Sequence, residues 1–295
     1  MLISNQTSAF LNHVLPIGGK HAVVVKDKQK GFFKHVVTDS IDELVQRICE
    51  LDHLEQDVYF ACASYSQGFY LNDHGKKCFR TAENAGWAKS FWLDIDCGYN
   101  KAEEGKGYID EERALCAIAN FCQTISLPLP TIVLSGGGLH CYFVLANEIP
   151  KEQWLHLAKR MKALTHHYDL LADDSRTSDI ASILRPVGTH NWKPERKGKQ
   201  VKLHHLSEPI PFESFAKLID DAFSLISPAE VVERNLPKID FPETDENIKR
   251  VKAALMLLNP NCDRAFWRDI CFALHSLGWS CSKDLAKSWS RGGLI

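Results

Sequence analysis

The sequence lacks the hydrophobic segments that mark membrane-spanning or exported chains. No run of about eighteen apolar residues occurs, and no short apolar segment of the signal-peptide type follows the first residues. Internal repeats and low-complexity tracts are absent too, and 45% of the 295 residues are hydrophobic, which excludes a fibrous or disordered chain. We therefore expect a globular protein of the cytoplasm with no membrane contact.

The sequence also has no cysteine framework. Its ten cysteines form no CxxC pair and no regular spacing. In a chain of this length, scattered cysteines are typical of reduced, mostly buried thiols in a cytoplasmic protein. A zinc site built from these cysteines and the thirteen histidines is an alternative that no ligand spacing supports.

A strong excess of either charge is missing as well. The formal net charge is −2, so the whole molecule is not a polycation. Any contact with nucleic acid would therefore need a local basic patch and bound metal. The densest basic stretch suits a nucleic-acid backbone, although a solvated loop is the commoner meaning of such a run. It comprises Lys193, Arg196, Lys197, Lys199 and Lys202.

Up to about residue 226, strand-like and helix-like patterns alternate. Ser40, followed three residues later by Glu43, forms a capping box that predicts a helix to about Leu51. Amphipathic spacing predicts two further helices, at residues 110–122 and 151–164. Short apolar runs predict strands at residues 22–25, 32–37, 58–63, 90–96, 131–134, 139–145 and 180–184.

The C-terminal part shows only helical spacing. Three prolines interrupt residues 227–246, which indicates a linker. Apolar residues then recur at helical spacing, with Gly278 as a stop and Ser282 as the cap of a last helix. We expect a mixed domain at residues 1–226, a linker at 227–246 and a small helical domain at 247–295.

Two aspartates share one face of the strand predicted at residues 90–96. Side chains alternate along a strand, so Asp94 and Asp96 point to the same side. Such close carboxylates repel unless a cation lies between them, and Mg²⁺ and Mn²⁺ prefer oxygen ligands. Two metals bridged by carboxylates can activate an attacking hydroxyl and stabilise a leaving pyrophosphate. Two solvated acids at a strand end are the commoner meaning of Asp-x-Asp taken alone.

Three consecutive glycines separate the strands predicted at residues 131–134 and 139–145. Gly136, Gly137 and Gly138 let backbone amides approach a ligand and point at anionic oxygen. Ser135 can add a hydroxyl donor, and His140 can donate to a triphosphate. No Gly-Lys-Ser/Thr follows, so the segment is not a Walker A loop. A glycine-rich hairpin with a structural histidine explains the segment equally well.

Acids precede the strand predicted at residues 180–184, and cations follow it. One carboxylate among Asp173, Asp174 and Asp179 could complete a metal site. Arg185 and Lys193 could hold phosphate groups, which arginine does in a forked geometry.

Together and in this order, these three segments resemble the archaeo-eukaryotic primase superfamily, specifically primase-polymerases of phages, plasmids and other mobile elements. The family motif h-h-D-h-D is matched by residues 92–96, and S-G-x-G-x-H or a near variant by residues 135–140. The third motif, an Asp followed by R-x-x-G-T-x-N-x-K, is matched by Asp173 and residues 185–193. Arg-Pro-Val-Gly replaces the Arg-Leu-Pro-Gly of many relatives, which we expect to alter the turn rather than the chemistry.

The resemblance implies a role for each matching residue. Asp94, Asp96 and Asp173 would bind Mg²⁺ or Mn²⁺, since the spacing to Arg185 favours Asp173 as the third acid. The same three acids and His140 would form the catalytic set. The incoming triphosphate would be contacted by Ser135, Gly136, Gly137, Gly138, His140, Arg185 and Lys193, and nucleic acid by Arg176, Lys193, Arg196 and Lys197.

The implied fold is α+β, with an RRM-like antiparallel sheet and flanking helices in the catalytic core and a small all-α domain after it. The implied activity is template-directed nucleotidyl transfer from NTP or dNTP on a single-stranded DNA template with a primer, with a helicase domain or partner downstream. A two-metal nuclease is one alternative, although it needs no triphosphate-binding turn. A non-catalytic replication-initiation or nucleic-acid-binding module is another, and the complete set of acids and His140 argues against it. Priming versus extension and NTP versus dNTP stay open.

Overall fold

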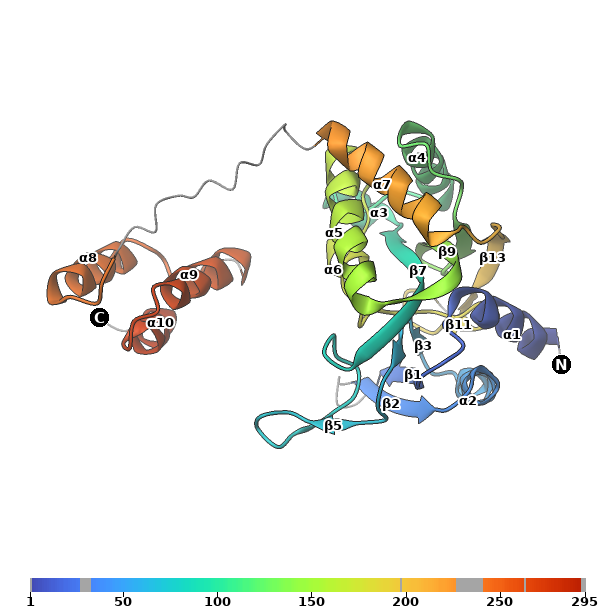
Figure 1. Ribbon diagram of the computed structural model, residues 1–295, viewed down its shortest axis with the longest axis horizontal. Helices are drawn as coiled ribbons and strands as arrows, with labels where there is room; N and C mark the ends of the chain where they lie inside the picture. The colour runs from blue at the N-terminus through green and yellow to red at the C-terminus, as the bar shows by residue number, and fades with distance from the viewer. Residues whose placement is uncertain (1, 27–32, 197, 227–240, 263, 293–295) are drawn as a thin grey trace. The chain divides into compact units, whose positions relative to one another are not determined.

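The computed structural model describes residues 2–26, 33–196, 198–226, 241–262 and 264–292. Contacts divide the chain into one unit at Met1–Ala229 and another at Glu230–Ile295, and each is described by itself. Figure 1 shows the strands gathered in the first unit and only helices in the second.

A five-stranded sheet forms the centre of the first unit. Its order is β13-β8-β9-β7-β4, and all of its strand pairs are antiparallel. The strands are β4 (Ser64–Tyr65), β7 (Ala85–Asp96), β8 (Thr131–Leu134), β9 (Gly138–Pro150) and β13 (Lys202–His205). β7 and β9 form the long central pair, in which Asp94 lies opposite His140 and Asp96 opposite Gly138.

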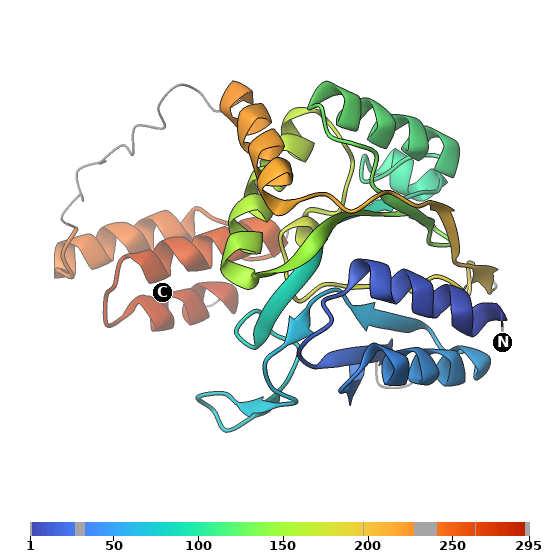
Figure 2. The ribbon, with the colours of Figure 1, turned by 45° about the vertical axis from the view of Figure 1, so that its right-hand side comes forward.

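The two faces of this sheet have different coverings. Phe91 and Phe143, which are paired on β7 and β9, contact the ring of Phe215 at centroid distances of 4.7 and 5.7 Å. Phe215 belongs to α7 (Phe212–Ile226), which lies beside α5 (Lys151–His167) in both ribbon views, and α4 (Glu111–Thr124) also packs on β9 (Figures 1 and 2). Because β-strand side chains alternate, Trp92, Asp94 and their partners on β9 lie on the opposite face.

That opposite face meets α1 and a smaller sheet. Tyr142, paired with Trp92, contacts Phe10 of α1 (Leu2–Val14) at 5.4 Å and Phe60 of β3 (Val58–Ala61) at 6.4 Å. The smaller sheet has the order β10-β3-β1-β2, with β1 (His21–Lys26), β2 (Phe33–Thr38) and β10 (Ile183–Leu184). α2 (Ile41–His53) packs on β1 and β3 and runs beside α1 (Figure 2). The catalytic candidates therefore lie between two sheets.

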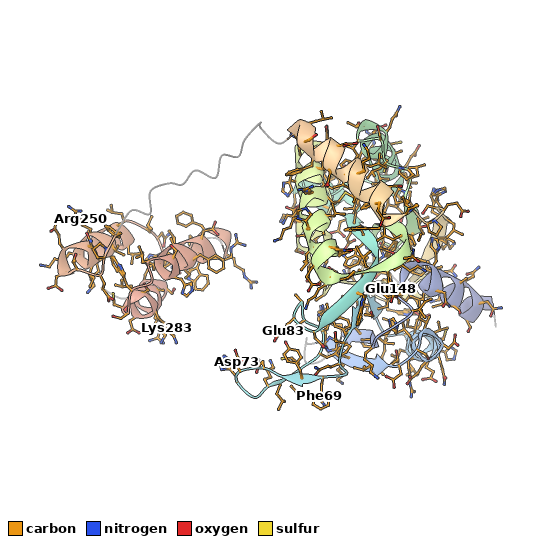
Figure 3. The ribbon with its side chains drawn as sticks, in the orientation of Figure 1. Phe69, Asp73, Glu83, Glu148, Arg250 and Lys283 are labelled. Carbon is orange, nitrogen blue, oxygen red and sulfur yellow. The ribbon has the colours of Figure 1, made fainter. Side chains whose placement is uncertain are left out.

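Short elements complete the first unit. The hairpin of β5 (Tyr70–Leu71) and β6 (Lys77–Cys78) projects from it, with Phe69 and Asp73 on the projecting part (Figure 3). The Tyr70 hydroxyl donates to Glu83 at 2.9 Å and fixes the base of this hairpin. The elements next to the central strands are α3 (Tyr99–Glu103), α6 (Asp174–Thr177), β11 (His190–Asn191) and β12 (Lys199–Gln200).

The second unit consists of α8 (Asp245–Met256), α9 (Arg264–Ser276) and α10 (Ser282–Ser290) in its described part. Leu255, Leu274 and Leu285 form its core together with two tryptophans, Trp279 and Trp289. Charged side chains such as Arg250 and Lys283 extend outward (Figure 3). A buried apolar cluster of this kind supplies most of the stability of a small helical bundle.

The predicted α+β class, with antiparallel sheets and C-terminal helices, is confirmed. Ser40 is confirmed as the N-cap, because the Glu43 N–H donates to Ser40 Oγ at 3.2 Å, whereas the Glu43 carboxylate accepts from the Asp39 N–H instead of the Ser40 N–H that a capping box requires. The strand predicted at residues 180–184 is reduced to Ile183–Leu184, and α1 and α7 were not predicted. Most of the predicted linker, residues 227–240, lies outside the described residues, and α8 begins at Asp245 after the N-cap Thr244.

The prediction that Ser282 caps the last helix is wrong. The N-cap is Cys281, and Ser282 is the first residue of α10. The N–H groups of Ser280 and Cys281 donate instead to the carboxylate of Glu243, at 2.7 and 3.1 Å. A hydrogen bond from the Ser280 hydroxyl, followed by these backbone hydrogen bonds, lowers the pKa of Glu243 to about 2. Glu243, which is distant in the sequence, therefore supplies the acceptor at the start of α10 that Ser282 was expected to supply.

No helix in the described ranges is long and apolar enough to span a bilayer.

Candidate active site

A cavity of about 650 Å³ lies between the two sheets of the first unit. The larger sheet contributes Asp94, Asp96 and His140, and β3 and β10 contribute side chains from the smaller sheet. The remaining walls come from the glycine turn and from the loop between β11 and β12. The predicted site residues that line this cavity are Asp94, Asp96, Ser135, Gly137, His140, Arg176, Arg185, Lys193 and Arg196.

Asp94 and Asp96 lie together, as predicted, at the C-terminal end of β7. Burial raises the pKa of Asp94 to about 7, and the neighbouring carboxylates of Asp96 and Asp173 act in the same direction. Asp96 is more exposed and pairs with Lys101 of α3, whose Nζ lies 2.7 Å from Oδ2. The partly buried carboxylate of Asp94 is therefore destabilised as an anion, which is the situation that a bound divalent cation would relieve.

Asp173 lies beside the pair but directs its carboxylate elsewhere. Its N–H donates to the Asp94 carbonyl at 2.7 Å, which fixes its backbone against β7. Its Oδ1 accepts from the N–H and hydroxyl of Ser175, at 2.8 and 2.6 Å, and so caps α6. Asp173 lines an adjoining cavity of about 480 Å³, which it shares with Asp96.

The other two acids have different partners. Asp174 lies 2.6 Å from Nε2 of His166, and the Asp179 carboxylate accepts from the Ala181 N–H at 2.9 Å within a turn. Of the three alternatives, Asp173 is thus the one whose backbone is bonded to β7 beside Asp94. Its role as third ligand stays a prediction.

The donor chemistry fits a divalent cation only in part. Among the described residues, no three acidic, histidine or cysteine side chains are gathered as a ready metal site. The physical reason is that Asp96 is paired with Lys101 and Asp173 is bonded to Ser175. Asp94 and Asp96 fit as an oxygen-ligand pair on one face. Asp173 caps α6 through Oδ1, so Oδ2, which lies 3.7 Å from Arg176 Nε, is the oxygen that it could offer to a cation.

The glycine turn is shaped by close backbone contacts. Gly138 has φ +154°, and a Cβ there would lie 2.0 Å from the Ile95 carbonyl oxygen on β7. Gly136 has φ +75°, and a Cβ there would meet Asn191 and the Lys199 carbonyl at 3.0 Å. Only Gly137 of the three lines the 650 Å³ cavity. Gly136 and Gly138 therefore allow the turn to form, and their contact with a triphosphate stays a prediction.

His140 is buried beside Asp94, with Nε2 3.8 Å from Oδ1. Burial lowers the pKa of His140 to about 3, and the positive charge of Arg185 acts in the same direction. The imidazole is therefore neutral at pH 7 and can donate through only one ring nitrogen. Nδ1 is buried and has no hydrogen-bond partner among the described residues.

Arg185 is held by two residues that the sequence did not single out. Its Nη2 donates to Asp57 Oδ1 at 2.8 Å and to the Tyr59 hydroxyl at 2.6 Å, and its guanidinium lies 4.5 Å from the centre of the Tyr59 ring. Asp57 directly precedes β3 and Tyr59 lies in it two positions later, so alternation places both side chains on the same face of the smaller sheet. This alternate spacing at the start of an apolar strand was the sequence feature that could have indicated the two residues, and no motif marks them.

The basic loop contributes cations of two kinds. Lys193 is exposed at the cavity, whereas the Arg196 Nη2 donates to the Cys97 carbonyl at 3.0 Å and its guanidinium covers Gly137. Arg176 lies 3.7 Å from Asp173, and its carbonyl accepts from the Trp92 indole at 3.0 Å. Lys197 lies outside the described residues.

No protein-family model and no curated protein matches the chain. Among solved structures, the AEP domain of the cyanophage S-2L primase-polymerase aligns with a TM-score of 0.51 at 14% identity, over 73% of this chain and 97% of that domain. The primase RepB′ aligns with a TM-score of 0.50 at 14% identity, over 99% of this chain and 87% of that protein. The chain has the fold of the archaeo-eukaryotic primase (AEP) type of primase-polymerases. The likeness to RepB′ extends to the helical second unit, and at this identity it concerns the fold.

Proposed function

We propose that this chain is a DNA primase-polymerase, a nucleotidyltransferase that joins NTP or dNTP along a single-stranded DNA template in the replication of a phage, plasmid or other mobile element. The observation that carries the proposal is the single cavity of about 650 Å³ that holds both Asp94 and Asp96 on one side and Ser135, Arg185 and Lys193 around them. Carboxylates for a cation and donors for a triphosphate thus meet in one space.

Asp94 and Asp96 would hold Mg²⁺ or Mn²⁺, which supplies activation of the attacking hydroxyl and neutralisation of the leaving pyrophosphate. Asp173 would become a third ligand. These acids need no proton-transfer role, because positioning and charge neutralisation account for most of the rate of nucleotidyl transfer.

The triphosphate would be bound by donors that line the same cavity as the two acids. Ser135 offers a hydroxyl, neutral His140 offers one N–H, and Lys193 offers an exposed ammonium group. Arg185 contributes a fixed positive charge, because Asp57 and Tyr59 hold its guanidinium before any substrate enters. A preoriented cation of this kind costs little reorganisation when phosphate binds.

Nucleic acid would contact the rim of the cavity. Arg176 and the basic loop with Lys193, Arg196 and Lys197 are the candidates, because phosphates attract local positive charge even when the net charge is near zero. Arg196 already donates to the Cys97 carbonyl, so its remaining N–H groups are the ones open to a phosphate.

The test follows the length of a 5′-labelled primer annealed to a single-stranded template, with NTP or dNTP and with Mg²⁺ or Mn²⁺. The variants are Asp94→Asn and Asp96→Asn, and the control is Glu104→Gln, an exposed acid that pairs with Lys106 at 3.0 Å. We expect metal-dependent lengthening by the parent and by Glu104→Gln, and loss in both aspartate variants. Metal-dependent shortening of the strands that requires Asp94 would identify a nuclease instead. Triphosphate binding without any product would favour a non-catalytic module.

A further inference from the structure

The last turn of α2 carries an acid at a place where helix electrostatics disfavour one. Asp52 lies one residue before the end of Ile41–His53, next to the carbonyl groups of the helix C-terminus. The partial negative charge of these carbonyl groups disfavours a carboxylate there. The residue is also buried, with 7% of its surface exposed, so its charge needs hydrogen-bond donors.

Those donors come from a distant loop. The His190 backbone N–H donates to Asp52 Oδ1 at 2.8 Å, and the Trp192 indole Nε1–H donates to the same oxygen at 3.1 Å. The second oxygen, Oδ2, lies 2.9 Å from Nδ1 of His190. The Asp52 side chain therefore binds His190 and Trp192, which lie just before Lys193 at the start of the basic loop.

These contacts fix the loop on the side away from the cavity. The Trp192 ring packs on Gly198, where a Cβ would lie 2.7 Å from the ring, and the Arg196 N–H donates to the Lys193 carbonyl at 2.8 Å. The loop is thus closed on itself and attached at one end to Asp52.

The loop is also attached after β7, where Arg196 Nη2 donates to the Cys97 carbonyl at 3.0 Å, and at the glycine turn. Asn191 Nδ2 donates to the Ser135 carbonyl at 3.3 Å. Trp192 and the loop cations line the 650 Å³ cavity, whereas Asp52 lines a separate cavity of about 610 Å³ on the other side of His190 and Trp192. Asp52 acts on the cavity only through its partners.

We propose that Asp52 is a positioning residue for the triphosphate site, which holds the loop so that Lys193 and Arg196 face the cavity. The inference rests on the proposed function, because it assigns the loop cations to triphosphate binding. A buried acceptor with three contacts fixes the direction of the loop more firmly than an exposed lysine or a single arginine hydrogen bond can.

Binding of a fluorescent nucleoside triphosphate to the full chain, measured by anisotropy with Mn²⁺, tests this. Asp52→Ala should weaken binding about tenfold, because small displacements of a positioned group have large effects. Asp52→Asn should restore most of the affinity, since its amide oxygen still accepts from His190 and Trp192 while its NH₂ can donate to a neutral imidazole. The control is Glu50→Ala, an exposed acid of the same helix that pairs with Arg47 at 3.0 Å, and it should bind like the parent.

Amide hydrogen exchange on the same variants provides a readout that needs no nucleotide. Asp52→Ala should accelerate exchange within residues 189–200 and leave β7 and β9 protected, whereas general destabilisation would accelerate exchange in all of them. Unchanged exchange in residues 189–200 would overturn the inference, as would parent-like triphosphate binding by Asp52→Ala. If the parent itself binds no triphosphate, the proposed function fails. Exchange that is accelerated only in the loop would then show that Asp52 is a structural anchor without a role in triphosphate binding, and the inference would be overturned as well.

Discussion

Asp94 and His140 face each other across β7 and β9, with the imidazole Nε2 3.8 Å from the carboxylate Oδ1. The two groups do not form a charged pair at neutral pH. Burial favours the neutral form of each, so the pKa of His140 falls to about 3 and that of Asp94 rises to about 7. The floor of the cavity therefore holds an uncharged donor beside an acid whose charge depends on what else is bound.

The first prediction concerns the pH dependence of stability. The pKa of Asp94 is raised in the folded state above its ordinary value of 3.8, so the folded chain binds this proton more tightly than the unfolded chain. The associated stability is complete below about pH 4 and is lost as the pH rises through about 7. Asp94→Asn should therefore be more stable than the parent by up to about 4 kcal/mol at pH 8 in the presence of a chelator. Urea unfolding at pH 4 and pH 8 checks this, and an equal difference at both pH values would contradict it.

A divalent metal ion should stabilise the folded parent, because its positive charge offsets the negative charge of the Asp94 carboxylate. A cation that binds only the folded chain adds about 2.7 kcal/mol when its concentration is a hundred times Kd. Thermal unfolding at pH 8 should show this upward shift with Mn²⁺ for the parent and for Glu104→Gln. Asp94→Asn and Asp96→Asn should show little of it. A shift of the same size in all four proteins would place the metal elsewhere.

Removing one partner of the Arg185–Asp57 pair should lower the free energy of unfolding much more than replacing both partners. Both side chains are nearly buried, with 7% and 11% exposed, so Asp57→Ala leaves an uncompensated guanidinium and should destabilise by about 3 kcal/mol. The double variant Asp57→Ala with Arg185→Met should recover part of that loss. A chemical denaturation cycle measures the coupling, and additive effects would show that the pair is not coupled.

Gly138 should tolerate no side chain. A Cβ there would meet the Ile95 carbonyl oxygen at 2.0 Å, so Gly138→Ala must displace β7 or β9 beside Asp96. We expect a loss of more than about 2 kcal/mol and loss of activity. The matched control is Gly75→Ala, which also has positive φ but has nothing within 4 Å of the added atom. It should cost about 1 kcal/mol. Equal unfolding free energies for the two variants would contradict this account.

Much of this site could be predicted from the sequence because strand alternation is local. Asp94 and Asp96 needed only the period of a strand, and the glycine run and Arg185 stood out by residue type. The α+β class followed from the resemblance that these segments share. The N-cap at Ser40 was readable for the same reason, since the cap and its partner are three residues apart.

What sequence reasoning missed depends on tertiary contacts. Asp52 and Asp57 matter through residues more than a hundred positions away, and no local pattern marks them. Glu243 took the capping role expected of Ser282 because the fold brings it to Ser280 and Cys281. The Asp173 N–H donates to β7 beside Asp94, and its side chain caps α6, which the sequence did not indicate.

The most direct measurement is the choice of nucleotide on defined templates. A primed single strand with one repeated template base is offered each of the four nucleotides separately, with Mn²⁺, and incorporation is compared between the parent, Asp94→Asn and Glu104→Gln. The account predicts that the parent and Glu104→Gln add only the complementary nucleotide to each template, and that Asp94→Asn adds none. Addition that ignores the template base, or that persists unchanged in Asp94→Asn, would contradict it.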